Sequence, residues 1–145
     1  MKNIIVNLWK NESLPIKDAI YFSDDSSFFC KITSYPVPHI EKGGEFDLLK
    51  FYEENADEVT NIDCLKEIRL SNNGYCCIGE GSYGSEGFIA CLDKDKNLIW
   101  VIYSENSNPI INVFEDAEGV IIAESSAEFR LKINIDNPLG LELII

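Results

Sequence analysis

The chain has 145 residues, of which 46% are hydrophobic and 26% are charged, and its 25 acidic against 12 basic side chains give a formal net charge of -13 at pH 7. This composition is too apolar for an intrinsically disordered chain and suits one globular domain spanning residues 1–145. The negative charge argues against direct binding to nucleic acid or to an anionic membrane, because both are polyanions that would repel the chain. A basic partner protein is compatible with this charge.

The first residues, MKNIIVNLWKNES, do not have the pattern of a signal peptide, because Asn7 and Lys10 interrupt a short apolar stretch and no small-residue cleavage site follows. The longest apolar runs elsewhere are far shorter than a membrane span. We therefore expect a cytoplasmic protein. Five cysteines without a C-x-x-C pair predict neither a disulfide framework nor a zinc site, and we expect most of them to be small buried side chains.

The first forty residues read as strands at 4–9, 19–22 and 28–33, because β-branched and aromatic residues alternate there with turn residues. Residues 24–27 form a plausible hairpin loop. Residues 35–39 predict a connector, since two prolines remove two backbone donors and favour extended backbone.

The one strong helical signal lies between Glu45 and Ile68, where Phe46, Leu49 and Tyr52 recur at helical spacing and a second turn follows a break near Asn55. From residue 72 onward, short β-rich runs alternate with turns. Residues 75–78 and 87–92 predict two strands joined by a Gly-rich loop, and residues 98–103 predict a central strand covered on both faces. We therefore predict an α+β fold, mostly antiparallel β-sheet with one or two helices around residues 45–68.

The last part of the chain predicts further strands at 110–114, 120–123 and 139–145. The clearest pattern begins at Phe129, where apolar residues alternate with Arg130, Lys132 and Asn134. A period of two places one face of a strand in the core and the other in water.

Residues 79–84 match the dinucleotide-binding pattern G-x-G-x-x-G, but a strand follows them where that motif needs a helix. Glu80 and Glu86 would also repel a phosphate. A hairpin loop is the better interpretation, and Tyr83 at its centre could contact a partner. The one histidine, His39, sits in a connector, so no nucleophile–histidine pair can be assembled. We predict no enzyme, no cofactor and no metal site.

The acidic residues are concentrated in the segment 41–67, which holds nine acids and three bases. Glu53, Glu54, Asp57 and Glu58 fall within two turns of the predicted helix. Two interpretations remain open for them: a solubilising helix face, or a docking site for a cationic surface.

Residues 79–109 carry a loose set of motifs: Gly84-Ser85-Glu86-Gly87-Phe88, then Leu92-Asp93, then Ile99-Trp100-Val101 and Ser107-Asn108-Pro109. This stretch resembles small immunity proteins of bacterial polymorphic toxin and contact-dependent growth inhibition systems, with some similarity to the SUKH superfamily. The resemblance implies a cytosolic antidote that binds one cognate toxin and blocks its active site or substrate groove. Many such toxins are nucleases with basic surfaces, which an acidic protein can occupy.

We predict two contact patches for that toxin. The first consists of Glu53, Glu54, Asp57 and Glu58, and the second of Glu80, Tyr83 and Glu86. Two other classes remain open. An acidic DNA mimic or anti-restriction inhibitor would space its carboxylates along an elongated surface, and a small β-rich enzyme or ligand-binding domain would show a pocket lined by Trp9, Trp100 or tyrosines.

Overall fold

A computed structural model of the chain describes residues 3–144 and, within them, shows two helices and twelve strands. The elements in chain order are α1 (Ile4–Lys10), β1 (Ser13–Pro15), β2 (Ala19–Phe22), β3 (Ser27–Thr33), β4 (His39–Phe46), α2 (Leu48–Glu54), β5 (Val59–Arg69), β6 (Tyr75–Gly81), β7 (Gly87–Leu92), β8 (Leu98–Ser104), β9 (Ile110–Ala117), β10 (Val120–Ser125), β11 (Arg130–Asn134) and β12 (Asn137–Ile144). The coarse prediction of an α+β fold built mostly from antiparallel strands is confirmed.

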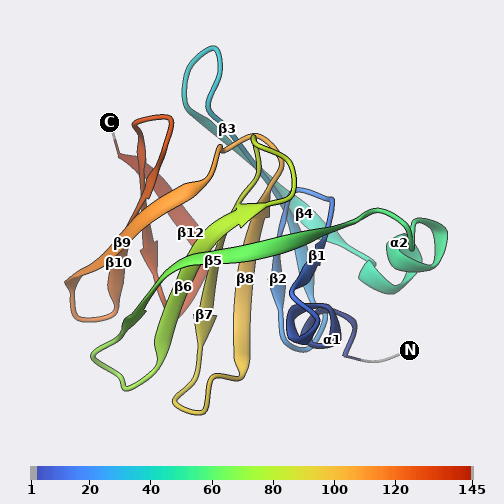
Figure 1. Cartoon of the computed structure of the whole chain (residues 1–145), viewed down its shortest axis with the longest axis horizontal. Coiled ribbons are helices and arrows are strands. Elements are labelled where there is room, and N and C mark those ends of the chain that lie inside the picture. The colour runs from blue at the N-terminus through green and yellow to red at the C-terminus, as the bar shows by residue number, and fades with distance from the viewer. Residues whose placement is uncertain (1–2, 145) are drawn as a thin grey trace.

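The strands form two antiparallel sheets (Figure 1). The larger sheet has eight strands in the order β1-β5-β6-β7-β8-β2-β3-β4, and the smaller has four in the order β12-β11-β10-β9. In the larger sheet β2 lies between β3 and β8, with Ala19 opposite Tyr103. The early strands β2–β4 and the later strands β5–β8 therefore join in one sheet through the pair β2–β8.

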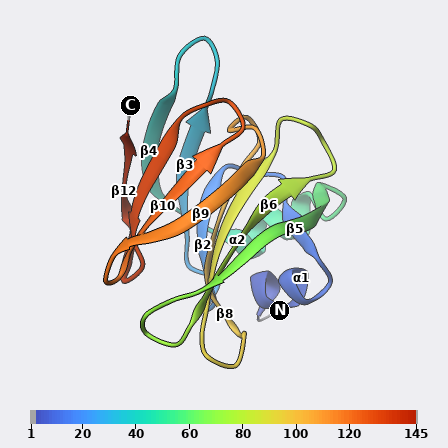
Figure 2. The same ribbon diagram turned by 60° about the vertical axis from the view of Figure 1, so that its left-hand side comes forward.

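The central strands of the eight-stranded sheet are covered on both faces, whereas β4 and most of β5 are exposed. Figure 2 shows the four-stranded sheet to one side of it and the two helices to the other. One core lies between the two sheets and includes Trp100 and Leu131, and a second core lies under the helices and includes Ile5, Leu48 and Phe88. Burial on both faces explains the continuous apolar run in β8, as predicted.

The alternation of buried and exposed side chains is clearest in the four-stranded sheet, which has one face exposed to solvent. In β11 the side chains of Leu131 and Ile133 are buried while Arg130, Lys132 and Asn134 are exposed, which confirms the predicted period of two. The hairpin between β6 and β7 also follows the prediction, but β6 continues to Gly81, so the loop is confined to residues 82–86.

The strand predicted at residues 4–9 is wrong, because this segment forms helix α1. Its apolar residues also fit a helical stripe, since Ile4 and Leu8 are four apart. What stabilises the helix is distant in sequence: the Asp25 carboxylate accepts hydrogen bonds from the backbone N–H groups of Ile4 and Ile5, at 3.0 and 2.9 Å. Such a contact cannot be read from the local pattern.

The helix predicted between Glu45 and Ile68 is too long. Helix α2 begins after Asp47, whose side chain accepts a hydrogen bond from the Lys50 N–H at 3.1 Å, and it ends at Glu54. The expected second turn is instead part of β5, which pairs along its length with β6 and at its start with β1. Pairing with β6 along residues 62–69 outweighs a weak local helical spacing there.

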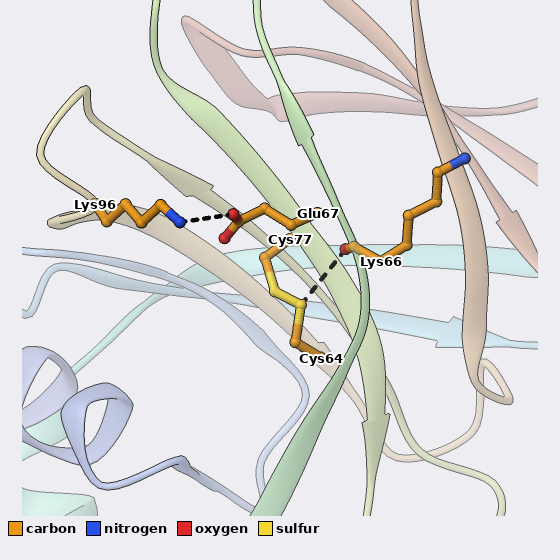
Figure 3. A network of polar contacts seen from close by, with 5 residues as sticks. All are labelled: Cys64, Lys66, Glu67, Cys77 and Lys96. Atoms are coloured by element: carbon orange, nitrogen blue, oxygen red, sulfur yellow. Dashed lines mark hydrogen bonds and ion pairs between the residues drawn. A yellow bond between two sulfur atoms is a disulfide. The ribbon is translucent and has the colours of Figure 1, made fainter.

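The expectation that most cysteines are buried is correct, but the cysteine pattern did not predict that two of them form a disulfide. Cys30, Cys76 and Cys91 are buried and free, whereas Cys64 on β5 forms a disulfide with Cys77 on β6, with the two Cα atoms 6.2 Å apart (Figure 3). Cys76 and Cys77 are neighbours on β6 and point to opposite faces, and both are buried because both faces of the sheet are covered at this strand. The disulfide follows from β5 being the neighbour of β6.

Within residues 3–144 no helix is long and apolar enough to cross a membrane.

Candidate functional site

The carboxylate of Glu86 organises one end of the eight-stranded sheet. Glu86 is only 2% exposed. Its Oε1 accepts hydrogen bonds from the Thr60 hydroxyl and from the backbone N–H of Tyr83, both at 2.9 Å, and its Oε2 accepts one from the Tyr103 hydroxyl. A side chain at Gly81 would collide with this carboxylate, so the glycine leaves the space that Glu86 occupies. A buried carboxylate with this many donors is a fixed anchor for the loop that carries it.

The anchored loop, residues 82–86, presents Tyr83 to solvent. Its other end is tied to β5, because the Ser82 N–H donates to the Thr60 hydroxyl at 3.1 Å and the Ser82 hydroxyl donates to the Asn61 carbonyl at 3.2 Å. Tyr83 is 63% exposed. An aromatic side chain held outward on a pre-ordered loop loses little conformational entropy when it contacts a partner.

Beside Tyr83 lies a hollow of about 360 Å³, which we call the acidic hollow. Its lining consists of Ile16, Tyr83, Ser85, Glu86, Glu105 and Asn106. Asp18 lies next to it and is buried, and its carboxylate accepts a hydrogen bond from the Glu105 N–H at 2.7 Å.

The lining of the acidic hollow contains two carboxylates, those of Glu86 and Glu105, and no basic side chain. Burial raises the pKa of Glu105, and the negative charges of Asp18, Glu86 and Glu58 raise it further. Burial also raises the pKa of Asp18, against the lowering effects of the Glu105 N–H and of two lysine charges. A cationic group entering the hollow would relieve this crowding, because an opposite charge nearby favours the ionised carboxylates.

The acidic hollow continues into a second one of about 380 Å³, since Ser85 and Asn106 line both. Tyr35, which is 87% exposed, is among the residues that line the second hollow. Tyr35 lies in the connector of the β3–β4 hairpin, which projects beyond the rest of the molecule in Figures 1 and 2. Two exposed tyrosines therefore line two adjacent hollows.

A wider and more open hollow, of about 820 Å³, lies between the β2–β3 turn and the start of α2, and four carboxylates line it. Two of them have structural roles: Asp25 caps α1 and Asp47 caps α2. The other two, Asp24 and Glu45, are exposed. This hollow adds to the acidic surface near α2.

The first predicted patch is split by the structure. Glu53 and Glu54 are exposed at the end of α2, and Asp57 and Glu58 are exposed in the turn before β5. None of the four lines the acidic hollow, but Glu58 is linked to its lining: its carbonyl accepts a hydrogen bond from the Ile16 N–H at 2.9 Å, and its charge acts on Glu105.

The second predicted patch does not form one surface. Glu80 shares a face of β6 with Cys76 and Ile78, the face toward the four-stranded sheet, whereas Gly81 beside it faces Glu86. The prediction that Glu86 contacts a partner does not fit the structure, because its carboxylate is buried and accepts hydrogen bonds from within the protein. Of Glu80, Tyr83 and Glu86, only Tyr83 has a largely exposed side chain.

Sequence reasoning missed Asp18 and Glu105. They come from the turn before β2 and the turn after β8, and the pairing of these two strands brings them together. No local spacing could indicate that contact.

A separate groove of about 350 Å³ lies beside α1, and its residues include Trp9, Ile62, Cys64, Phe88 and Lys96. Trp9 packs edge-on against Phe88, with ring centroids 5.7 Å apart. Trp100, the other tryptophan, is buried between the sheets, where its indole N–H donates to the Ile135 carbonyl at 2.9 Å. Of the two tryptophans proposed as pocket residues, only Trp9 lines a groove.

Within residues 3–144 no group of three or more histidine, cysteine or carboxylate side chains is placed to hold a metal ion. Comparison with protein families, with curated proteins and with solved structures found no match to this chain.

Proposed function

We propose that this protein is an immunity protein that binds and neutralises a basic, nuclease-type bacterial toxin by covering the toxin's active site or substrate groove. The observation that carries the proposal is the acidic hollow beside the exposed Tyr83. It combines an exposed aromatic side chain on a fixed loop with carboxylates whose like charges repel one another. A lysine or arginine of a phosphate-binding surface supplies the missing charge.

The overall charge supports the same partner class. A net charge of -13 attracts a basic protein over a distance and speeds its association, especially at low salt. A nuclease presents a basic surface because it must hold a phosphate backbone. The resemblance of residues 79–109 to immunity proteins points to the same class of partner.

The proposal is tested with the protein encoded by the gene immediately upstream. We expect a large secreted protein whose C-terminal domain stops growth when it is produced in the cytoplasm of a test bacterium. Co-production of this chain should restore growth. A metabolic enzyme upstream, or a toxic domain that this chain does not neutralise, would contradict the proposal.

Two variants then locate the interface. Tyr83→Ala and Glu58→Lys should each weaken binding to that domain by about tenfold or more, because loss of an interface anchor costs on the order of 1–2 kcal/mol. The Glu58→Lys effect should shrink as salt is added. Glu142→Lys, an exposed charge reversal on β12 in the other sheet, is the matched control and should bind like the original chain.

A small β-rich ligand-binding domain is the second candidate, and the groove lined by Trp9 favours it. Titration with simple sugars should then change the fluorescence of Trp9, and Trp9→Phe should abolish the change. An unchanged spectrum over a millimolar series would remove this candidate.

A further inference from the structure

The two residues of the Cys64–Cys77 disulfide differ in their exposure to solvent. Cys64 is exposed on β5, whereas Cys77 on β6 is only 3% exposed and belongs to the core beneath the helices. Figure 3 shows the bond crossing from one strand to the other, with the Cys64 sulfur 3.5 Å from the Lys66 carbonyl oxygen. A reagent that approaches from solvent therefore meets the Cys64 sulfur first.

The groove beside α1 leads to this disulfide. Both cysteines line it, and Trp9 and Phe88 form part of its apolar wall. Its charged residues are balanced, with Lys10 and Lys96 against Glu12 and Glu67. In a chain of net charge -13, such a balanced region does not repel an anionic small thiol as the rest of the surface does.

The other three cysteines are separated from this pair. Cys30, Cys76 and Cys91 lie in the core between the two sheets, on the opposite face of the eight-stranded sheet from Cys77. Burial raises the pKa of Cys30 to about 11 and that of Cys91 to about 12, and it raises the pKa of Cys76 as well. Since the thiolate is the reactive form, these thiols do not compete in exchange.

We propose that Cys64 is a modification site at which a small thiol of the glutathione class becomes joined to the protein. The thiolate of the small molecule attacks the Cys64 sulfur, and a new disulfide forms between them. The bond between Cys64 and Cys77 breaks, its electron pair leaves with Cys77, and that thiolate takes up a proton from water. In the reverse step the Cys77 thiolate attacks the Cys64 sulfur and releases the small thiol.

The difference in exposure between the two cysteines selects the attacked sulfur. Displacement at a disulfide needs the attacking sulfur, the attacked sulfur and the leaving sulfur nearly in line. Because Cys64 is exposed and Cys77 is only 3% exposed, attack on Cys64 from the solvent side meets that requirement more readily than attack on Cys77. This site is separate from the acidic hollow, so its failure would leave the proposed toxin interface untouched.

The test uses the full chain with Cys64→Ser and Cys77→Ser as a matched pair. Each is incubated with oxidised and reduced glutathione under native conditions, quenched with acid, and analysed by intact mass and peptide mapping. Cys77→Ser should carry one glutathione on Cys64, and the labelling rate should exceed that of Cys77 in Cys64→Ser by at least about tenfold, because access limits exchange. Equal or faster labelling of Cys77 would overturn the proposal.

The unmodified sequence provides a second measurement that does not depend on how the variants fold. With reduced glutathione in excess, an acid quench at early times should trap the mixed disulfide on Cys64. Trapping on Cys77, or full reduction with no mixed disulfide on Cys64 at any time or ratio, would also overturn the proposal.

Discussion

The hydroxyl of Tyr103 donates a hydrogen bond to the carboxylate of Glu86, and both side chains are buried. Tyr103 belongs to the central strand β8, and Glu86 closes the loop that carries the exposed Tyr83. Burial, the Glu86 hydrogen bond and nearby negative charges raise the pKa of the Tyr103 phenol, so the phenol stays protonated as the donor. The loop that we propose as a partner contact is thus fixed from within the sheet.

Glu86→Ala should lower the free energy of unfolding by about 2–4 kcal/mol, because it leaves the Tyr103 hydroxyl, the Thr60 hydroxyl and the Tyr83 N–H without their acceptor. Urea unfolding followed by circular dichroism measures this change. Glu53→Ala, an exposed residue at the end of α2, is the control and should change stability by less than about 0.5 kcal/mol. Equal effects of the two substitutions would contradict the assigned role of Glu86.

Gly81→Ala should destabilise the protein by about 1–3 kcal/mol, because the added methyl group meets the Glu86 carboxylate and its neighbours must shift. Gly84→Ala in the same loop is the matched control, since nothing lies within 4 Å of a side chain added there. The comparison of urea midpoints checks the prediction. A Gly81→Ala variant as stable as Gly84→Ala would show that Glu86 does not occupy this space.

Stability should fall as the pH rises above about 4.5. Burial and neighbouring carboxylates raise the pKa of Glu105 above its ordinary value of 4.5, and burial raises that of Asp18 above 3.8. Between the ordinary and the raised pKa the folded state binds more protons than the unfolded chain, so the free energy of unfolding decreases with rising pH. Asp24, Asp93 and Glu115 have lowered pKa values, and their contribution is lost only below this window.

Glu105→Gln tests the pH dependence directly. It removes one raised carboxyl, so the loss of stability between pH 5 and pH 7 should become smaller than in the original chain. Glu118→Gln, an exposed change in the β9–β10 turn, should keep the original slope. If both variants and the original chain share one slope, the charge crowding in the acidic hollow is refuted.

Asp25→Asn should lower the free energy of unfolding by about 1 kcal/mol, because the amide keeps only one of the two oxygens that accept from the N–H groups of Ile4 and Ile5. Asparagine also tolerates the positive φ of this position, 73°, so backbone strain does not contribute to the loss. Asp95→Asn in an exposed turn is the control. Amide hydrogen exchange in α1 should accelerate in Asp25→Asn alone.

Reduction of the Cys64–Cys77 disulfide should cost about 3 kcal/mol of stability, as expected for a cross-link between residues separated by 13 positions. Urea unfolding with and without a reducing agent measures this difference. Cys64→Ser should be close to the reduced protein and should lose nothing further on reduction. A variant that still responds to the reducing agent would place the disulfide elsewhere.

The elements that could be predicted are those whose pattern is set by burial. The continuous apolar run of β8 and the alternation of β11 report how many of their faces are covered, and the sequence carries that information directly. The turn at residues 93–97 is rich in Asp and Asn, residues typical of turns, and the Asp93 carboxylate accepts hydrogen bonds from the N–H groups of Asp95 and Asn97.

The elements that could not be predicted depend on partners far away in the chain. Helix α1 is capped by Asp25, and β5 is a strand because β6 and β1 pair with it on either side. The acidic hollow is a similar case, because Asp18 and Glu105 meet only when β2 pairs with β8. The sequence could indicate an excess of acidic residues near α2, but not that the charge of Glu58 would act on Glu105.

The position of β2 inside the larger sheet also decides when that sheet can be completed. Ala19 leaves the ribosome early, and its partner Tyr103 follows only after most of the chain has been made. Until then the hairpins of β2–β4 and β5–β7 have no common neighbour. The order of the strands thus makes the joining of the sheet a late event in biosynthesis, and pairing between such distant segments is intrinsically slow.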